Sequence, residues 1–178
     1  TTNYPSALTK KKQGNRTLEK CLQSAQKNGI KVFVGLNFNE RWWKVDYDAR
    51  WLLEQMEMGN KVADELVVLY KEKYPDAMYG WYWVWEVDNL NCMTSERQSI
   101  LAEALNTNLN HLSEIAPEMP LMLSPFMNYK VGGNAEECGK MWTNVFAQTD
   151  FRPGDIFAPQ DCGGAGGLNL DNLWEWFS

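Results

Sequence analysis

The sequence has little of what metal-dependent and histidine-dependent enzymes need. It contains one histidine, His111, and its four cysteines are widely separated, with no CxxC pair. Zinc sites are usually built from close pairs of Cys and His, and a His-based nucleophilic triad needs partners that we do not find here. We therefore expect no metal and no cofactor, although a site made of carboxylates alone stays open. An even number of cysteines permits disulfides without requiring them.

The chain also lacks a basic excess and a long apolar run. Its 17 basic residues stand against 23 acidic ones, and the formal net charge is −6. Because nucleic-acid phosphates favour a basic surface, we expect no nucleic-acid partner. No stretch approaches the roughly 18 apolar residues of a membrane-spanning helix, so no membrane span is expected either.

Aromatic residues are what the chain has in abundance, with nine Trp, seven Tyr and seven Phe among 178 residues. A chain of this length is normally one domain with a sizeable core, and we predict a single domain over residues 1–178. Aromatic side chains fill such cores, but their faces also stack on sugar rings. Each of them can therefore be a core residue or a binding residue, and the core is the better interpretation for any one of them.

Strand-like and helix-like segments alternate along the chain. Strands are predicted over residues 30–36, 78–85, 119–126 and 155–159, and helices over 17–28, 48–74, 95–115, 134–146 and 170–177. Asp48, Asn134 and a capping box of Ser95 with Gln98 are the predicted N-terminal caps, and Gly29 ends the first helix. Short apolar strands that alternate with helices indicate a parallel sheet.

Two architectures share this order of elements. An open doubly wound sheet would carry a phosphate-binding glycine turn after its first strand, but Leu36 is followed by Asn-Phe-Asn-Glu. An α/β barrel needs eight strands and about 250 residues, more than the 178 present. We predict an α/β fold of the (β/α)8 TIM-barrel type, incomplete in this chain, with four to five βα units and both ends missing. The edges of such a half-barrel would pair with the missing segments or with a second copy.

The strand predicted over residues 78–85 ends abruptly in Glu86-Val87-Asp88-Asn89. The carboxyl ends of parallel strands are where α/β folds place their chemistry. Alternation along the strand sends Tyr82, Val84 and Glu86 to one face and the three tryptophans to the other, under the helices. A carboxyl group beside so much aromatic surface is a candidate for the raised pKa that a general acid requires. The alternative is an ordinary strand end followed by a solvated acidic turn.

Five short motifs follow one another along the chain. They are Tyr4-Pro5-Ser6, Val32 to Leu36, Gly80-Trp81-Tyr82 with Glu86, Ser124-Pro125-Phe126, and Asp155-Ile156 with Pro159-Gln160-Asp161. In this order they resemble a bacterial domain family of unknown function, DUF4434, which looks like a TIM-barrel relative of glycoside hydrolases. The resemblance implies a carbohydrate substrate and a bacterial protein that is exported to the periplasm or outside the cell, where it can be surface-anchored.

The resemblance also implies a role for Glu86, whose placement is similar to that of the acid/base residue in related barrel hydrolases. Glycoside hydrolysis generally needs a second carboxyl group, which many of those enzymes carry on their seventh strand. Within this chain the best candidate is Asp161, which ends a strand beside a glycine-rich loop, although a turn or cap residue is the slightly better interpretation of this position. Asp88 would share the face of Glu86 if the strand continued, where it could bind substrate, but a position in the turn after the strand is the better interpretation.

Further residues are predicted to bind the sugar. Trp42 and Trp43 follow the first strand and are candidates for stacking, with a loop anchored by buried indoles as the alternative. Polar residues at other strand ends are candidates for hydrogen bonds to sugar hydroxyls: Tyr4, Asn37, Ser124, Asn128 and Gln160. The sequence thus predicts a glycoside hydrolase-like protein. A non-catalytic carbohydrate-binding barrel and a purely structural module are the alternatives.

Overall fold

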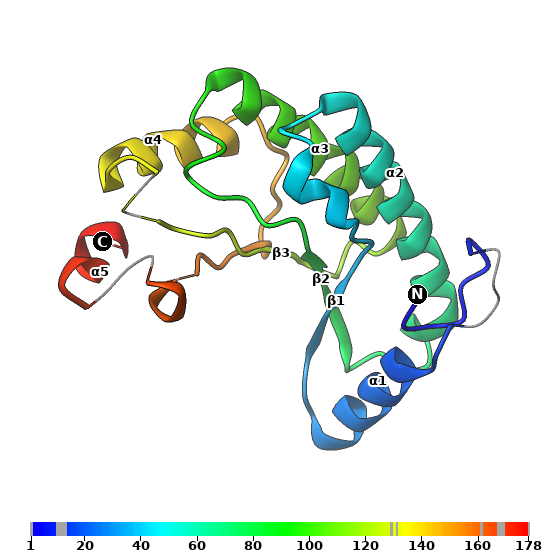
Figure 1. The fold of residues 1–178 in the computed structure, drawn as a ribbon. Helices are drawn as coiled ribbons and strands as arrows, with labels where there is room; N and C mark the ends of the chain where they lie inside the picture. The colour runs from blue at the N-terminus through cyan, green and yellow to red at the C-terminus, as the bar shows by residue number, and fades with distance from the viewer. Residues whose placement is uncertain are drawn as a thin grey trace.

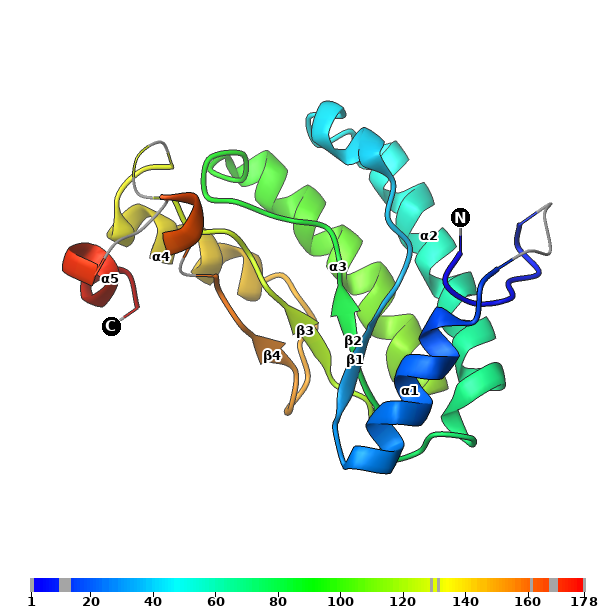
Figure 2. The same ribbon diagram turned by 60° about the horizontal axis from the view of Figure 1, so that its bottom comes forward.

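Four parallel strands form one sheet, and their order in the sheet is their order in the chain (Figures 1 and 2). The computed structural model describes residues 2–9, 14–128, 130, 132–160, 162–166 and 170–177. The strands are β1 (Val32–Gly35), β2 (Met78–Trp83), β3 (Leu121–Leu123) and β4 (Ile156–Phe157). Each pairs in parallel with the next, with Val34 opposite Trp81 and Trp83 opposite Leu123. The predicted parallel sheet is confirmed, although every strand is shorter than predicted.

Helices connect the strands in the predicted alternation. They are α1 (Thr17–Asn28), the 3₁₀ helix η1 (Glu40–Lys44), α2 (Ala49–Leu66) with the π-helical turn η2 (Val67–Lys71), α3 (Ser95–Ile115), α4 (Ala135–Phe146), the 3₁₀ helix η3 (Gly163–Ala165) and α5 (Leu170–Phe177). In the part of the chain that the structure describes, no helix combines the length and the apolar character needed to cross a membrane.

Two of the three predicted helix N-termini are confirmed. Asp48 accepts a hydrogen bond from the Trp51 amide at 3.0 Å, and Asn134 forms a reciprocal capping box with Glu137. The capping box predicted for Ser95 and Gln98 is wrong, because Thr94 is the residue with extended backbone and its side chain accepts from the Arg97 amide.

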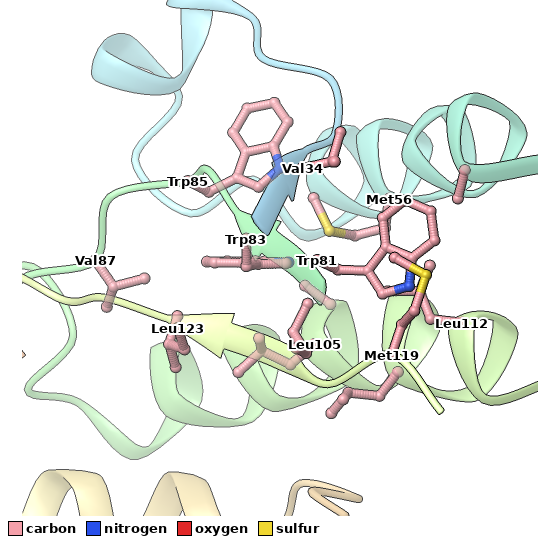
Figure 3. Close-up of a cluster of buried hydrophobic side chains, with 14 of the residues drawn as sticks. Val34, Met56, Trp81, Trp83, Trp85, Val87, Leu105, Leu112, Met119 and Leu123 are labelled. Carbon is pink, nitrogen blue, oxygen red and sulfur yellow. The ribbon is translucent and has the colours of Figure 1, made fainter. Parts of the chain in front are cut away.

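The tryptophans of β2 and its extension are core residues, as predicted. Trp81, Trp83 and Trp85 are almost completely buried, and Figure 3 shows them with Met56 of α2 and Leu105 of α3 in one apolar cluster. Figure 2 shows α2, α3 and α4 along the same face of the sheet. The large aromatic load therefore fills the layer between sheet and helices.

The opposite face of β2 carries no tryptophan and leads to Glu86. Gly80 lies here, and a Cβ at this position would be 2.4 Å from the ring of Phe33, so only glycine lets that ring cross β2. Tyr82 and Val84 follow on the same face and are partly exposed. The alternation predicted from sequence therefore places the Glu86 side chain at the end of the more open face.

An ion-pair node joins α1 to the segment that follows η2. The carboxylate of Glu19 contacts Arg16 Nε at 2.7 Å and Lys73 Nζ at 2.6 Å. The hydrogen bonds from Arg16 and Lys73 lower the pKa of Glu19 to about 2, against an ordinary value near 4.3. Since the folded-state pKa is the lower one, this stabilisation is complete above about pH 5 and is lost as the pH falls through 4 towards 2.

We therefore expect Glu19→Gln to lower the melting temperature at pH 7, and the difference from the parent protein to shrink as the pH falls towards 2. Thermal melts followed by circular dichroism at pH 7, 5, 4 and 3 would measure it. Glu57→Gln, at an exposed position of α2, is the matched control and should change little at any pH. A difference that stays constant from pH 7 to pH 3 would contradict the role of this node.

Candidate functional site

A pocket of about 210 Å³ opens beside the carboxyl ends of β1 and β2. The loop after β1 and the loop after β2 form its walls. Its lining residues are Trp42, Trp43, Lys44, Asp46, Tyr47, Glu86, Asp88 and Asn91. Four predicted site residues, Trp42, Trp43, Glu86 and Asp88, are thus brought together from two segments that are far apart in the sequence.

Glu86 is held by its backbone and leaves its carboxylate accessible. The neighbouring side chains Trp85 and Val87 are buried, whereas Glu86 is exposed. The Glu86 carbonyl oxygen accepts a hydrogen bond from Trp42 Nε1 at 2.9 Å. The three tryptophans of the strand pack on its other face, as predicted, and so they do not surround the Glu86 carboxyl group. A carboxylate placed in this way can exchange protons with a bound ligand.

Asp88 combines the two interpretations that its sequence position allowed. It forms a parallel bridge with Phe126, which in turn bridges to Gln160, so the strand direction continues beyond the end of β2. Its carboxylate also accepts hydrogen bonds from the Asn91 amide at 2.6 Å and from Asn91 Nδ2 at 2.8 Å, which closes a turn. Asp88 is therefore a pocket-lining carboxylate whose orientation is fixed by Asn91.

The two adjacent tryptophans of η1 have different environments. Trp42 is 8% exposed and packs against the rings of Tyr47 and Trp85 at centroid distances of 5.5 and 5.8 Å. Trp43 is 59% exposed and lines the pocket. Trp42 therefore anchors the loop, as the alternative interpretation had it, and Trp43 is the one whose ring faces are accessible to a ligand.

The loop between η1 and α2 has strained backbone next to the pocket. Asp46 and Tyr47 have positive φ angles of 43° and 60°, which non-glycine residues adopt rarely and at a cost of about 1–3 kcal/mol each. Arg97 of α3 holds this conformation, since its guanidinium forms an ion pair with Asp46 and lies over the Tyr47 ring. Burial, together with the neighbouring Cys92 thiol and Asp88 carboxylate, raises the pKa of Tyr47 well above its usual value.

Replacing Arg97 with alanine should loosen this loop with little loss of global stability, because partly exposed ion pairs contribute about 0–1 kcal/mol. We expect the backbone amides of residues 44–48 to exchange with solvent faster, as measured by hydrogen–deuterium exchange and mass spectrometry. Arg50→Ala, which breaks the exposed Arg50–Glu54 pair on α2, is the control. Equal exchange of these amides in the two variants would show that Arg97 does not hold the loop.

Polar residues at the ends of β3 and β4 bond to each other's backbone instead of lining the pocket. Ser124 Oγ donates to the Ala158 carbonyl at 2.8 Å, and Gln160 Nε2 donates to the Ser124 carbonyl at 3.0 Å. Asn128 Oδ1 accepts from the Lys130 amide at 2.9 Å within its own loop. The first two of these contacts hold the ends of β3 and β4 together. Asp161 lies outside the described residues.

Two other predicted residues lie away from the pocket. Asn37 turns towards α2, and a Cβ at Gly59 would lie 2.9 Å from its Oδ1. Tyr4 is buried, and its hydroxyl donates to Glu65 of α2 at 2.8 Å, beside a 2.6 Å hydrogen bond from Ser6 Oγ to the same carboxylate oxygen. Burial, and to a smaller extent Glu65, raises the pKa of Tyr4 to about 12 although Ser6 acts to lower it. The Tyr4-Pro5-Ser6 motif therefore anchors the N-terminal segment to α2.

Several pocket residues were not predicted from the sequence. They are Lys44, at the end of η1, and the loop residues Asp46, Tyr47 and Asn91. Their positions depend on contacts between distant segments. The segment before the Asp48 cap, Lys44-Val45-Asp46-Tyr47, mixes polar and apolar residues without a helical or strand period, so it gave no signal for a site. Across the residues that the structure describes, no group of three or more His, Cys, Asp or Glu side chains could hold a metal ion.

Comparisons with known proteins identify the family of the chain and a protein that shares its fold. A family model described as a domain of unknown function, DUF4434, matches residues 1–178. The crystal structure of a "putative alpha-L-fucosidase" from Bacteroides thetaiotaomicron superposes with a TM-score of 0.76 and 22% sequence identity. The match covers 98% of this chain and 52% of the other, so the chain spans about half the length of that protein and shares its fold. Among curated proteins, none matches the sequence.

Proposed function

This chain belongs to the DUF4434 family, and from that premise we propose that it forms part of a (β/α)8 barrel that acts on carbohydrate at the Glu86 pocket. The strand order supports the barrel, because β1 to β4 follow the chain without the reversal that defines a doubly wound sheet. The fold of the protein from Bacteroides thetaiotaomicron supports it too. The pocket lies at the carboxyl ends of the strands, where barrel enzymes carry their active sites.

An eight-stranded barrel needs four strands besides these. In the described residues β1 pairs only with β2, and β4 pairs only with β3, so the outer edges of β1 and β4 are where further strands would join. We propose that these strands come from a further segment of the same protein or from a second copy. Unpaired strand edges favour such pairing, because their backbone groups otherwise lack partners in the sheet.

The proposed reaction is hydrolysis of a glycosidic bond with Glu86 as the general acid. The observation that carries this proposal is the accessible carboxylate of Glu86 in a pocket shared with Asp88 and the exposed ring of Trp43. The acid would protonate the leaving oxygen, and a second carboxylate would act as nucleophile or base. Asp88 is proposed to bind a sugar hydroxyl, and Asp161 remains the proposed auxiliary carboxylate. Because the structural neighbour carries the name of an alpha-L-fucosidase, α-L-fucosides belong among the first substrates to try.

A non-catalytic carbohydrate-binding barrel is the second candidate, and the state of the pocket carboxylates favours it. Asp46 is paired with Arg97, and Asp88 accepts two hydrogen bonds from Asn91. Glu86 is then the carboxylate of this pocket most available for acid–base chemistry. A hydrolase would need its second carboxylate from Asp161 or from a strand outside this chain.

One experiment separates the two candidates. The intact protein is incubated with polysaccharides and with aryl glycosides that include an α-L-fucoside, while binding of the same sugars is measured by calorimetry. Release of the aryl group or of reducing ends would establish a hydrolase. Binding without turnover would establish a carbohydrate-binding barrel, and neither binding nor turnover would contradict both proposals.

A further inference from the structure

Two large aromatic side chains stand exposed next to the Glu86 pocket. Phe38, which follows β1, is 44% exposed, and Trp43 of η1 is 59% exposed. Their ring centroids are 6.0 Å apart and the ring planes are tilted by 58°. Neighbouring exposed aromatic rings of this kind mark a binding surface more often than isolated apolar residues do.

The core holds these rings from behind. Phe38 packs on Trp85 with a centroid distance of 5.3 Å, and Trp85 is itself buried. Trp85 is fixed by edge contacts with Trp42 at 5.8 Å and with Trp51 of α2 at 5.7 Å. The exposed pair is thus the outer end of a continuous cluster of aromatic rings in tilted and edge contacts. Because the two side chains are already held in place, binding of a ligand there costs little free energy for ordering the protein.

The adjoining pocket indicates the charge of the ligand. Its lining includes three carboxylates, Asp46, Glu86 and Asp88, and one cation, Lys44. Asp46 is also paired with Arg97, which leaves an excess of one negative charge. A ligand that carries a carboxylate or a sulfate would be repelled by this field. A neutral sugar would instead find hydrogen-bonding partners on Glu86, Asp88 and Asn91.

The volume of the pocket indicates the size of the ligand. It holds about 210 Å³, which is below the roughly 300–1,000 Å³ of sites for drug-sized molecules. One sugar ring is therefore the appropriate occupant, with any further sugars outside the pocket. The exposed aromatic pair lies where the apolar face of a ring could stack.

We propose that Phe38 and Trp43 form a stacking platform for a neutral pyranose ring whose hydroxyl groups face Glu86, Asp88 and Asn91. This inference rests on the proposed carbohydrate site and adds the charge class of the sugar and a residue, Phe38, that the sequence did not indicate. The platform acts in binding, so it is separable from catalysis by Glu86.

The test measures binding of neutral oligosaccharides, including fucosylated ones, and of matched uronate or sulfated oligosaccharides to the intact protein. Trp43→Ala should weaken binding of a neutral ligand about tenfold, and Phe38→Ala should weaken it measurably, as expected for truncated aromatic anchors. Trp174→Ala is the control, because this tryptophan of α5 is also highly exposed. Anionic ligands should bind at least tenfold more weakly than neutral ones at low salt, with a smaller difference at high salt.

Equal affinities in Trp43→Ala and Trp174→Ala, or tighter binding of anionic sugars, would overturn the platform. The outcome is independent of hydrolysis. Binding that depends on Trp43 without any turnover would support the platform and contradict the hydrolase. Turnover that depends on Glu86 and is unaffected by Trp43→Ala and Phe38→Ala would support the hydrolase and overturn the platform.

Discussion

Replacing Trp83 with alanine is expected to lower the free energy of unfolding by about 3–5 kcal/mol, the usual cost of truncating a buried tryptophan. Trp83 lies in the middle of the layer between sheet and helices and is 2% exposed. Leu123 lies opposite it on β3, and Leu105 of α3 belongs to the same cluster (Figure 3). Truncation to alanine leaves a cavity between the sheet and the helices, and these elements can move in to fill only part of it.

A hydrogen bond adds to this cost. Trp83 Nε1 donates to Asn108 Oδ1 at 3.1 Å. The side-chain nitrogen Nδ2 of the buried Asn108 donates to the Met56 carbonyl and to Asn60 Oδ1. Without the indole, the buried Asn108 oxygen loses its donor, which costs about 1–3 kcal/mol. Trp83→Phe keeps much of the apolar volume but removes the donor, so it should fall between the parent protein and Trp83→Ala.

Urea unfolding followed by circular dichroism measures both variants. Trp174→Ala removes the same side chain from an exposed position of α5 and should change stability by less than about 0.5 kcal/mol. A decrease in the free energy of unfolding of less than about 1 kcal/mol in Trp83→Ala would mean that the buried tryptophans contribute little to the stability of the core.

Replacing Glu86 with glutamine is expected to reduce the rate of hydrolysis of an alkyl glycoside, whose leaving oxygen needs a proton, by about 10²- to 10⁴-fold, the range for losing a positioned general acid. Glutamine has nearly the same shape as glutamate but cannot give up a proton to the leaving oxygen. The exposed side chain contributes little to the core, and the hydrogen bond from Trp42 to the Glu86 carbonyl involves only backbone of residue 86. The unfolding free energy should therefore stay within about 0.5 kcal/mol of the parent value.

The measurement compares steady-state rates of the parent, of Glu86→Gln and of Glu57→Gln, a matched substitution at an exposed position of α2. Only Glu86→Gln should lose activity, and its loss should appear in kcat. Unchanged turnover in Glu86→Gln would remove this residue from the mechanism.

Features with a strict local period could be predicted from the sequence. The two-residue alternation of β2 separates Trp83 from Tyr82 without any knowledge of the fold, and the structure has this separation. The same alternation leads to Glu86 at the strand end. Asp48 and Asn134 were also predictable as helix caps, because an Asp or Asn just before an apolar period has few other roles.

Features that depend on distant contacts could not be predicted. The conformation of Asp46 is held by Arg97, which lies 51 residues further along the chain. Trp42 and Trp43 are chemically identical neighbours, and only the direction of the η1 turn decides which indole is buried. The choice between Thr94 and Ser95 as a cap is similar, since either hydroxyl could serve and the backbone conformation decides.

The most direct test of the central claim, that Glu86 protonates the leaving oxygen, compares two substrates of Glu86→Gln with different leaving groups. Dinitrophenolate is a stable anion, so it leaves its glycoside without being protonated. The alkoxide of an alkyl glycoside is a poor leaving group and needs a proton from the acid. Relative to the parent, we expect Glu86→Gln to lose most of its kcat/KM on the alkyl glycoside and little of it on the dinitrophenyl glycoside. Equal losses on both substrates would contradict the role of Glu86 as the general acid.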